Sequence, residues 1–110
     1  MSLTTIVIPI LPGKTPEWRT FIAELNGPRH QEFADSRKAA GVHERTFLQE
    51  SPMGDFVLVT LEGDDPLRSF GQLMSGTDDF SAWFTKNAMA AHGELTQGNL
   101  KPAELVADSD

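Results

Sequence analysis

Cysteine is absent from the sequence, and this absence removes several classes of chemistry. Disulfide bonds, thiolate nucleophiles and cysteine-ligated zinc or iron–sulfur sites are all excluded. The lack of cysteine also fits a reducing compartment, so we expect a cytoplasmic protein. The histidines, His30, His43 and His92, lack the short spacings of metal-binding motifs. We therefore expect no metal site and no cofactor.

Positive charge is also scarce, because 9 Lys and Arg residues face 16 Asp and Glu residues, for a net charge of −7. Nucleic acids and anionic membranes repel an acidic surface. The longest apolar run lies near the N-terminus and has about eight residues, whereas a membrane-spanning helix needs about 20. No basic segment precedes that run, as one would in a signal peptide. We expect a soluble protein with no nucleic-acid or membrane partner.

The sequence does contain a series of strand and helix signals, separated by glycine and proline. Residues 3–11 are apolar on both faces, which is typical of a strand buried on both sides. Trp18, Phe21, Ile22 and Leu25 have the spacing of one helix face. The Asn-Gly-Pro segment at 26–28 interrupts this helix, which either kinks there or is followed by a second helix.

Two clear strands, a further helical region and one weak strand complete the series. Residues 42–51 and 55–62 favour strands, and the SPMG turn between them predicts a hairpin. Helices are predicted to begin near residues 64–66 and 77–79, where acidic side chains favour a helix N-terminus, and to end at Gly76 and Gly93. A short strand is predicted over residues 103–107, before a loose acidic tail.

The order of these elements is β-α-β-β-α-β, the pattern of a ferredoxin-like α+β domain. It predicts a four-stranded antiparallel sheet with the first and third strands in the centre and the helices on one face. The 110 residues suit a single domain over 1–110, with a core over about residues 4–106.

Both faces of the predicted hairpin carry apolar side chains when its strands are paired around Pro52 and Met53. Two helices bury only one face, and an exposed apolar patch is a liability in a monomer. We therefore predict a homodimer that packs sheet against sheet. The opposed residues are Leu48 and Val57, Thr46 and Val59, and Glu44 and Leu61 on one face, and Phe47 and Leu58, Arg45 and Thr60, and His43 and Glu62 on the other.

The stretch ERTFLQESPMGDFVLVTLEGDDP, together with the element order and the two-faced sheet, resembles the dimeric α+β barrel superfamily. That superfamily includes antibiotic-biosynthesis-monooxygenase-like and EthD-like domains, and the stretch is most similar to an uncharacterised bacterial branch. The resemblance covers about residues 4–106 and implies a shared fold and a dimer. It implies little about activity, since these domains host heme breakdown, quinone-forming oxygenation, isomerisation and no known catalysis.

His43, Arg45 and Glu62 form the strongest candidate site. His43 and Glu62 are opposed across the hairpin, so Glu62 would orient the imidazole while Arg45 held an anionic group of a ligand. The simpler alternative is a polar cross-strand pair at the wet end of the sheet. A one-residue slip in the register would put Glu44 where Arg45 is placed, so Glu44 is also a candidate ligand-binding residue.

Three further residues are weighed against simpler roles. His30 is a second candidate catalytic base near a pocket mouth, and the alternative is a surface histidine. Trp83 is a candidate wall for a flat aromatic ligand, and the alternative is an ordinary core residue. His92, beside Gly93, is interpreted as a charge partner of the helix C-terminus.

Three functions stay open. The first is a small-molecule-binding or accessory domain that forms a homodimeric α+β barrel. The second is a cofactor-free monooxygenase or isomerase for an aromatic or polyketide-like compound, with His43 or His30 as the base. The third is a structural or regulatory dimer whose cavity is filled by side chains.

Overall fold

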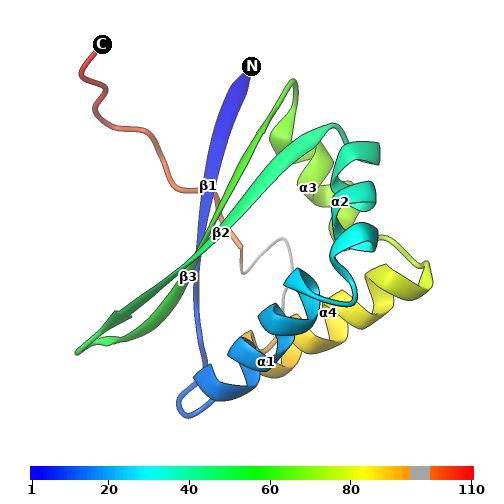
Figure 1. Cartoon of the computed structure of the whole chain (residues 1–110). Coiled ribbons are helices and arrows are strands. Elements are labelled where there is room, and N and C mark those ends of the chain that lie inside the picture. The colour runs from blue at the N-terminus through cyan, green and yellow to red at the C-terminus, as the bar shows by residue number, and fades with distance from the viewer. Residues whose placement is uncertain (95–99) are drawn as a thin grey trace.

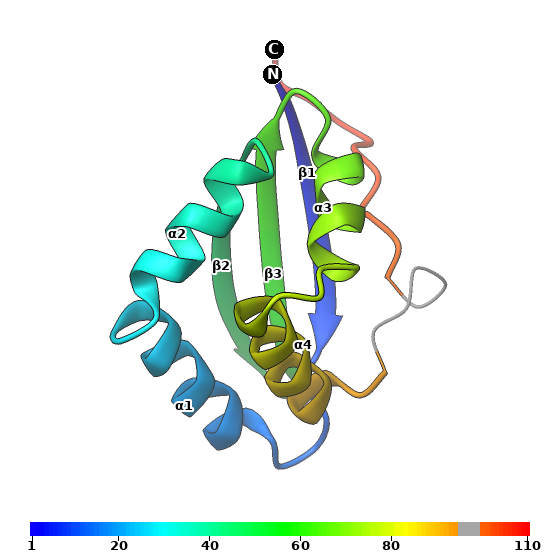
Figure 2. The same ribbon diagram turned by 90° about the vertical axis from the view of Figure 1, so that its right-hand side faces the viewer.

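An antiparallel sheet with helices against one face makes up the fold of the computed structural model, which describes residues 1–94 and 100–110 (Figure 1). The turned view shows every labelled helix in front of the same face of the sheet (Figure 2). This arrangement confirms an α+β fold with an antiparallel sheet. The elements are β1 (Ser2–Pro9), α1 (Thr15–Asn26), α2 (His30–Ala39), β2 (Val42–Ser51), β3 (Gly54–Gly63), α3 (Pro66–Met74) and α4 (Asp79–His92).

The prediction of a four-stranded sheet is wrong for the residues that the structure describes, where the sheet has three strands in the order β1-β3-β2. β3 is therefore central, and β1 lies at an edge. The segment 103–107 forms no strand. The tail meets the outer edge of β1 through a bridge between Pro102 and Ile6 and a 2.7 Å bond from the Ala103 N–H to the Thr5 carbonyl. Pro102 has no N–H to donate, which limits a ladder at this edge.

The β2–β3 hairpin has the predicted register. His43 lies opposite Glu62, Phe47 opposite Leu58, and the strands meet at the pair of Ser51 and Gly54. The Ser51 hydroxyl holds the turn, because it donates to the Gly54 carbonyl at 2.7 Å and accepts from the backbone N–H of Met53 at 3.2 Å. Gly54 has a φ of 125°, a value that L side chains rarely adopt. The turn thus assigns each hairpin side chain to one face.

The helix boundaries follow the sequence signals. The segment 27–29 separates α1 from α2, so the interruption divides the helix in two. The carboxylates of Asp65 and Asp78 accept hydrogen bonds from the backbone N–H groups of Arg68 and Ser81, each at 3.3 Å, and so cap α3 and α4. No helix within residues 1–94 or 100–110 has the length and hydropathy that a bilayer crossing requires.

The core lies between the helices and one face of the sheet. Ile6 of β1 and Leu61 of β3 are 1% and 0% exposed, and both belong to this helix-side face. The opposite face, which we call the open face, carries Leu3, Val7 and Phe47 at 63%, 45% and 51% exposure. β1 therefore alternates between buried and exposed side chains, and is not buried on both sides in the single chain.

Candidate functional site

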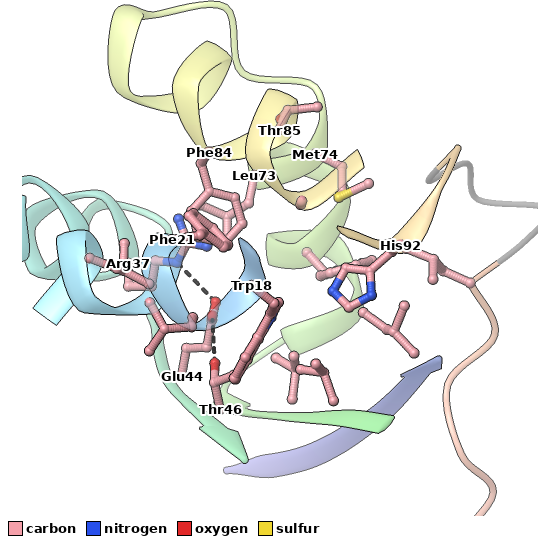
Figure 3. A pocket seen from close by; sticks show the side chains of 18 residues that line it. Trp18, Phe21, Arg37, Glu44, Thr46, Leu73, Met74, Phe84, Thr85 and His92 are labelled. Carbon is pink, nitrogen blue, oxygen red and sulfur yellow. Dashed lines mark hydrogen bonds and ion pairs between the residues drawn. The ribbon is translucent and has the colours of Figure 1, made fainter. Parts of the chain in front are cut away.

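A cavity of about 70 Å³ lies between the helix-side face of the sheet and the helices (Figure 3). It is partly open to solvent. Most of its wall is apolar and comes from several elements, including Trp18 of α1, Val57 and Val59 of β3, and Phe84 of α4. The alternation of β3 directs its odd-numbered residues toward the helices, and this places the two valines in the wall.

A charged pair interrupts this apolar wall. Nε of Arg37 donates to a carboxylate oxygen of Glu44 at 2.9 Å, and their side chains are 11% and 6% exposed. The Thr46 hydroxyl donates to the other carboxylate oxygen at 3.4 Å, and Nη1 of Arg37 donates to the Ser36 hydroxyl at 2.8 Å. Figure 3 shows Arg37, Glu44 and Thr46 joined in one chain of contacts on the same side of the cavity. The cavity therefore has a hydrogen-bonding side.

The guanidinium of Arg37 is also held by aromatic rings. It lies 4.8 Å from the ring centroid of Phe33 and 4.6 Å from that of Phe84. Phe33 precedes Arg37 by one helical turn, so α2 presents both side chains on one face. A cation over an aromatic face contributes about 0.5–1 kcal/mol at exposed sites and more where water is excluded. These contacts keep the arginine in one orientation at the cavity.

His92 ends α4 and also lines the cavity. Its Nδ1 lies 2.9 Å from the carbonyl oxygen of Pro9, where β1 ends. Burial lowers the pKa of His92, and the hydrogen bond to Pro9 offsets this only in part. The prediction of a charged partner for the helix C-terminus is therefore not supported, since the folded protein favours the neutral imidazole.

His43, Arg45 and Glu62 do come together, but on the open face and away from the cavity. The Arg45 guanidinium forms an ion pair with Glu62. This hydrogen bond and charge lower the pKa of the Glu62 carboxyl, and His43 adds a smaller effect of the same sign. Glu44 points to the other face and lines the cavity, so the register separates it from the other three charged residues.

His30 and Trp83 lie outside the lining of the cavity. His30 is the first residue of α2 and shares an open surface groove with His43 and Arg37. Trp83 packs against Phe21 with ring centroids 5.3 Å apart, and the Arg29 guanidinium lies 4.4 Å from its ring centroid. Its position at the contact between α1 and α4 fits a role in helix packing.

Arg37 is the cavity residue that reasoning from the sequence missed. It occurs between Phe33 and Ala40, at positions that fall on the same helix face. A cation inside an apolar stripe is a signal of a buried ion pair, and this pattern was available in the sequence. Arg37 and His92 both line the cavity but come from separate helices, so only the folded chain brings them to one site.

Within the described ranges, no cluster of three or more metal-ligating side chains occurs. Comparison with known proteins adds no relative, since no protein-family model and no curated protein matches the chain.

Proposed function

We propose that this protein is a homodimeric α+β domain that binds a small, mostly apolar molecule in the cavity between its sheet and helices. The supporting observation is the buried pair of Arg37 and Glu44 in an otherwise apolar wall. Small-molecule sites characteristically combine apolar walls with a few polar groups that orient the ligand. The pair offers donors and acceptors at one defined side.

The energetics of a buried ion pair favour this interpretation over a purely structural role. Withdrawing two charges from water costs several kcal/mol for each ion, and apolar side chains of similar volume are often equally or more stabilising. Nη2 of Arg37 donates no hydrogen bond within residues 1–94 and 100–110, so this donor stays available beside the pair. A ligand carbonyl or ether oxygen would use this donor.

The size of the cavity restricts the ligand. An apolar cavity of about 150 Å³ accommodates benzene, whereas this cavity measures about 70 Å³. A ligand with one ring therefore requires movement of the lining side chains. Met74 and Leu73 lie in the wall on α3, and methionine adapts its shape at little energetic expense. Molecules of about one ring are the upper limit that we propose.

Toluene is a suitable first probe for this function. We expect a toluene titration to shift the backbone NMR signals of cavity residues such as Trp18 and Val57. Ala88→Leu would fill the cavity from α4 and abolish the shifts, whereas Ala90→Leu makes the same change at an exposed position of that helix. Absence of any shift in the natural protein, or equal loss in both variants, would refute the proposal.

The dimer would form through the open face. Of its residues, Arg45 and Glu62 carry opposite charges and pair with each other, so the face is close to neutral in a chain of net charge −7. Two acidic copies repel one another least through a neutral surface, and the exposed Val7 and Phe47 would be buried there. In such a dimer two sheets would face each other, as the resemblance to dimeric α+β barrels implies. The tail beside β1 lies where the fourth strand of a ferredoxin-like sheet would be.

Sedimentation tests the dimer directly. We expect a mass of about twice 12.1 kDa at micromolar concentration. Phe47→Asp would place an unpaired charge in the interface and dissociate it, whereas Met53→Asp lies at the exposed hairpin tip and would leave it intact. A monomeric natural protein would exclude this part of the proposal.

A second candidate function is proton transfer on a bound compound, as in a cofactor-free isomerase or monooxygenase. His92 favours it, because a neutral imidazole in a cavity is a suitable general base. This assignment moves the candidate base from His43 and His30, which lie outside the cavity lining, to His92. The cavity itself supports both functions over a structural dimer with a filled interior.

A further inference from the structure

We propose that the ligand of the cavity is a neutral molecule with a weakly acidic hydroxyl group, a phenol or an enol, and that this hydroxyl donates a hydrogen bond to Nε2 of His92. This inference rests on the ligand-binding function proposed above and adds the chemical class of the ligand. The hydrogen bond between His92 and Pro9 determines which nitrogen of the imidazole carries the proton.

The contact between His92 and Pro9 determines the tautomer. A backbone carbonyl oxygen only accepts hydrogen bonds, so Nδ1 of His92, at 2.9 Å, must be the donor. A neutral imidazole has one donor and one acceptor nitrogen, and Nε2 is therefore an acceptor. The two nitrogens lie on separate edges of the ring, so the acceptor points away from Pro9.

Nε2 has no hydrogen-bond partner within the described part of the chain, and His92 belongs to the cavity wall. The other ionisable side chains of that wall are Arg37 and Glu44, which bond to each other. The ligand thus meets a neutral acceptor at His92 and an internally compensated pair at the other polar site. A neutral ligand that supplies one donor suits this arrangement better than an anion or a cation.

The donor should be a hydroxyl of appreciable acidity. Hydrogen bonds to an imidazole nitrogen strengthen as the donor becomes more acidic, and a phenol, with a pKa of about 10, stays protonated beside a histidine. Phenols and enols also provide the apolar body that the rest of the wall requires. In the second candidate function, the proton of the ligand O–H would pass to Nε2 and the electron pair would stay on the ligand oxygen, which gives a phenolate or enolate beside an imidazolium whose Nδ1–H still donates to the Pro9 carbonyl. This step needs no further reactant.

Phenol and toluene provide a matched pair of probes, because they have similar shapes and differ in the hydroxyl. We expect the hydroxyl of phenol to increase its affinity for the natural protein about two- to tenfold, which is the effect of one added hydrogen bond. The comparison is the phenol-to-toluene affinity ratio, measured by NMR titration and referred to the same ratio in variants that lack the acceptor.

His92→Asn is the decisive variant. The amide nitrogen of asparagine is attached to Cγ, as Nδ1 is, so it can still donate to Pro9, but no atom replaces Nε2. We expect the phenol-to-toluene ratio to fall by about two- to tenfold, and the ratio cancels any change in apolar contact that the smaller side chain causes. His43→Asn, on the open face, is the control and should leave both affinities unchanged.

The outcomes separate the two proposals. If neither probe binds the natural protein, the ligand-binding function is wrong and this inference fails with it. If both bind and His92→Asn leaves their ratio unchanged, only the role of His92 is wrong. NMR shifts of the imidazole nitrogens give a readout that does not depend on any ligand, since a proton found on Nε2 of the neutral ring would also overturn the inference.

Discussion

Replacing Arg37 with methionine tests whether the buried pair behaves as its burial requires. The change removes the guanidinium that pairs with the Glu44 carboxylate, whose side chain is only 6% exposed in the natural protein. Breaking a buried ion pair in this way costs about 3–5 kcal/mol. Small domains are stable by about 5–15 kcal/mol in total, so the loss should move the urea midpoint strongly.

The surface pair of Arg19 and Glu50 is a matched control for this measurement. Its ion-pair distance is 2.7 Å, close to that of the buried pair, but its side chains are 59% and 61% exposed. An exposed pair contributes about 0–1 kcal/mol, so Arg19→Met should change the free energy of unfolding by no more than that. The double variant Arg37→Met with Glu44→Leu should recover most of the loss, because no unpaired charge stays buried.

Equal effects of Arg37→Met and Arg19→Met on the free energy of unfolding would refute this reasoning. Such a result would mean that water reaches Glu44 as readily as it reaches a surface carboxylate. A double variant as unstable as Arg37→Met would instead locate the loss in the aromatic packing of the arginine, against Phe33 and Phe84. Urea unfolding followed by tryptophan fluorescence distinguishes these outcomes.

Two further predictions concern pH and backbone packing. Because burial lowers the pKa of His92, its contribution to stability is present above the ordinary histidine value and is lost as the pH falls through the folded pKa. His92→Asn should flatten this part of the pH profile of the urea midpoint, and an unchanged slope would contradict the burial effect. Gly63→Ala should destabilise by about 1–3 kcal/mol in thermal unfolding, because the added Cβ would overlap the carbonyl oxygen of Gly41. If Gly63→Ala kept the Tm of the natural protein, the backbone near Gly41 and Gly63 would separate easily enough to accept the added Cβ.

The hairpin shows how much of the fold the sequence could predict. A short turn at Pro52 and a two-residue alternation leave one register that keeps apolar residues together, and that register occurs. The helix ends were predictable as well, because caps and prolines act on residues that are close in the sequence. The tail was not predictable, because a strand at residues 103–107 depends on whether a distant edge accepts it. Within the described residues 100–110, Pro102 and Ala103 make the backbone contacts to β1.

The site was harder to predict than the fold. The predictable register of the hairpin indicated a cluster of His43, Arg45 and Glu62, and the cluster forms. It lies on the open face, however, whereas the helices and the cavity lie on the other face. Charge at His92 was expected from its place at a helix end. The structure adds burial and the Pro9 carbonyl, both of which depend on the packing of α4 against β1. Local sequence signals therefore identified candidate residues but could not predict their burial or their hydrogen-bond partners.

The strand order also affects how the chain folds during its synthesis. β1 is synthesised before its partner β3, which lies roughly 50 residues downstream, so their pairing requires closure of a long loop. The β2–β3 hairpin is local and can form within about 1–10 μs once it is complete. The apolar β1 therefore stays unpaired until β3 has been made. Its docking onto the finished hairpin is the step at which we expect the nascent chain to be most exposed to aggregation.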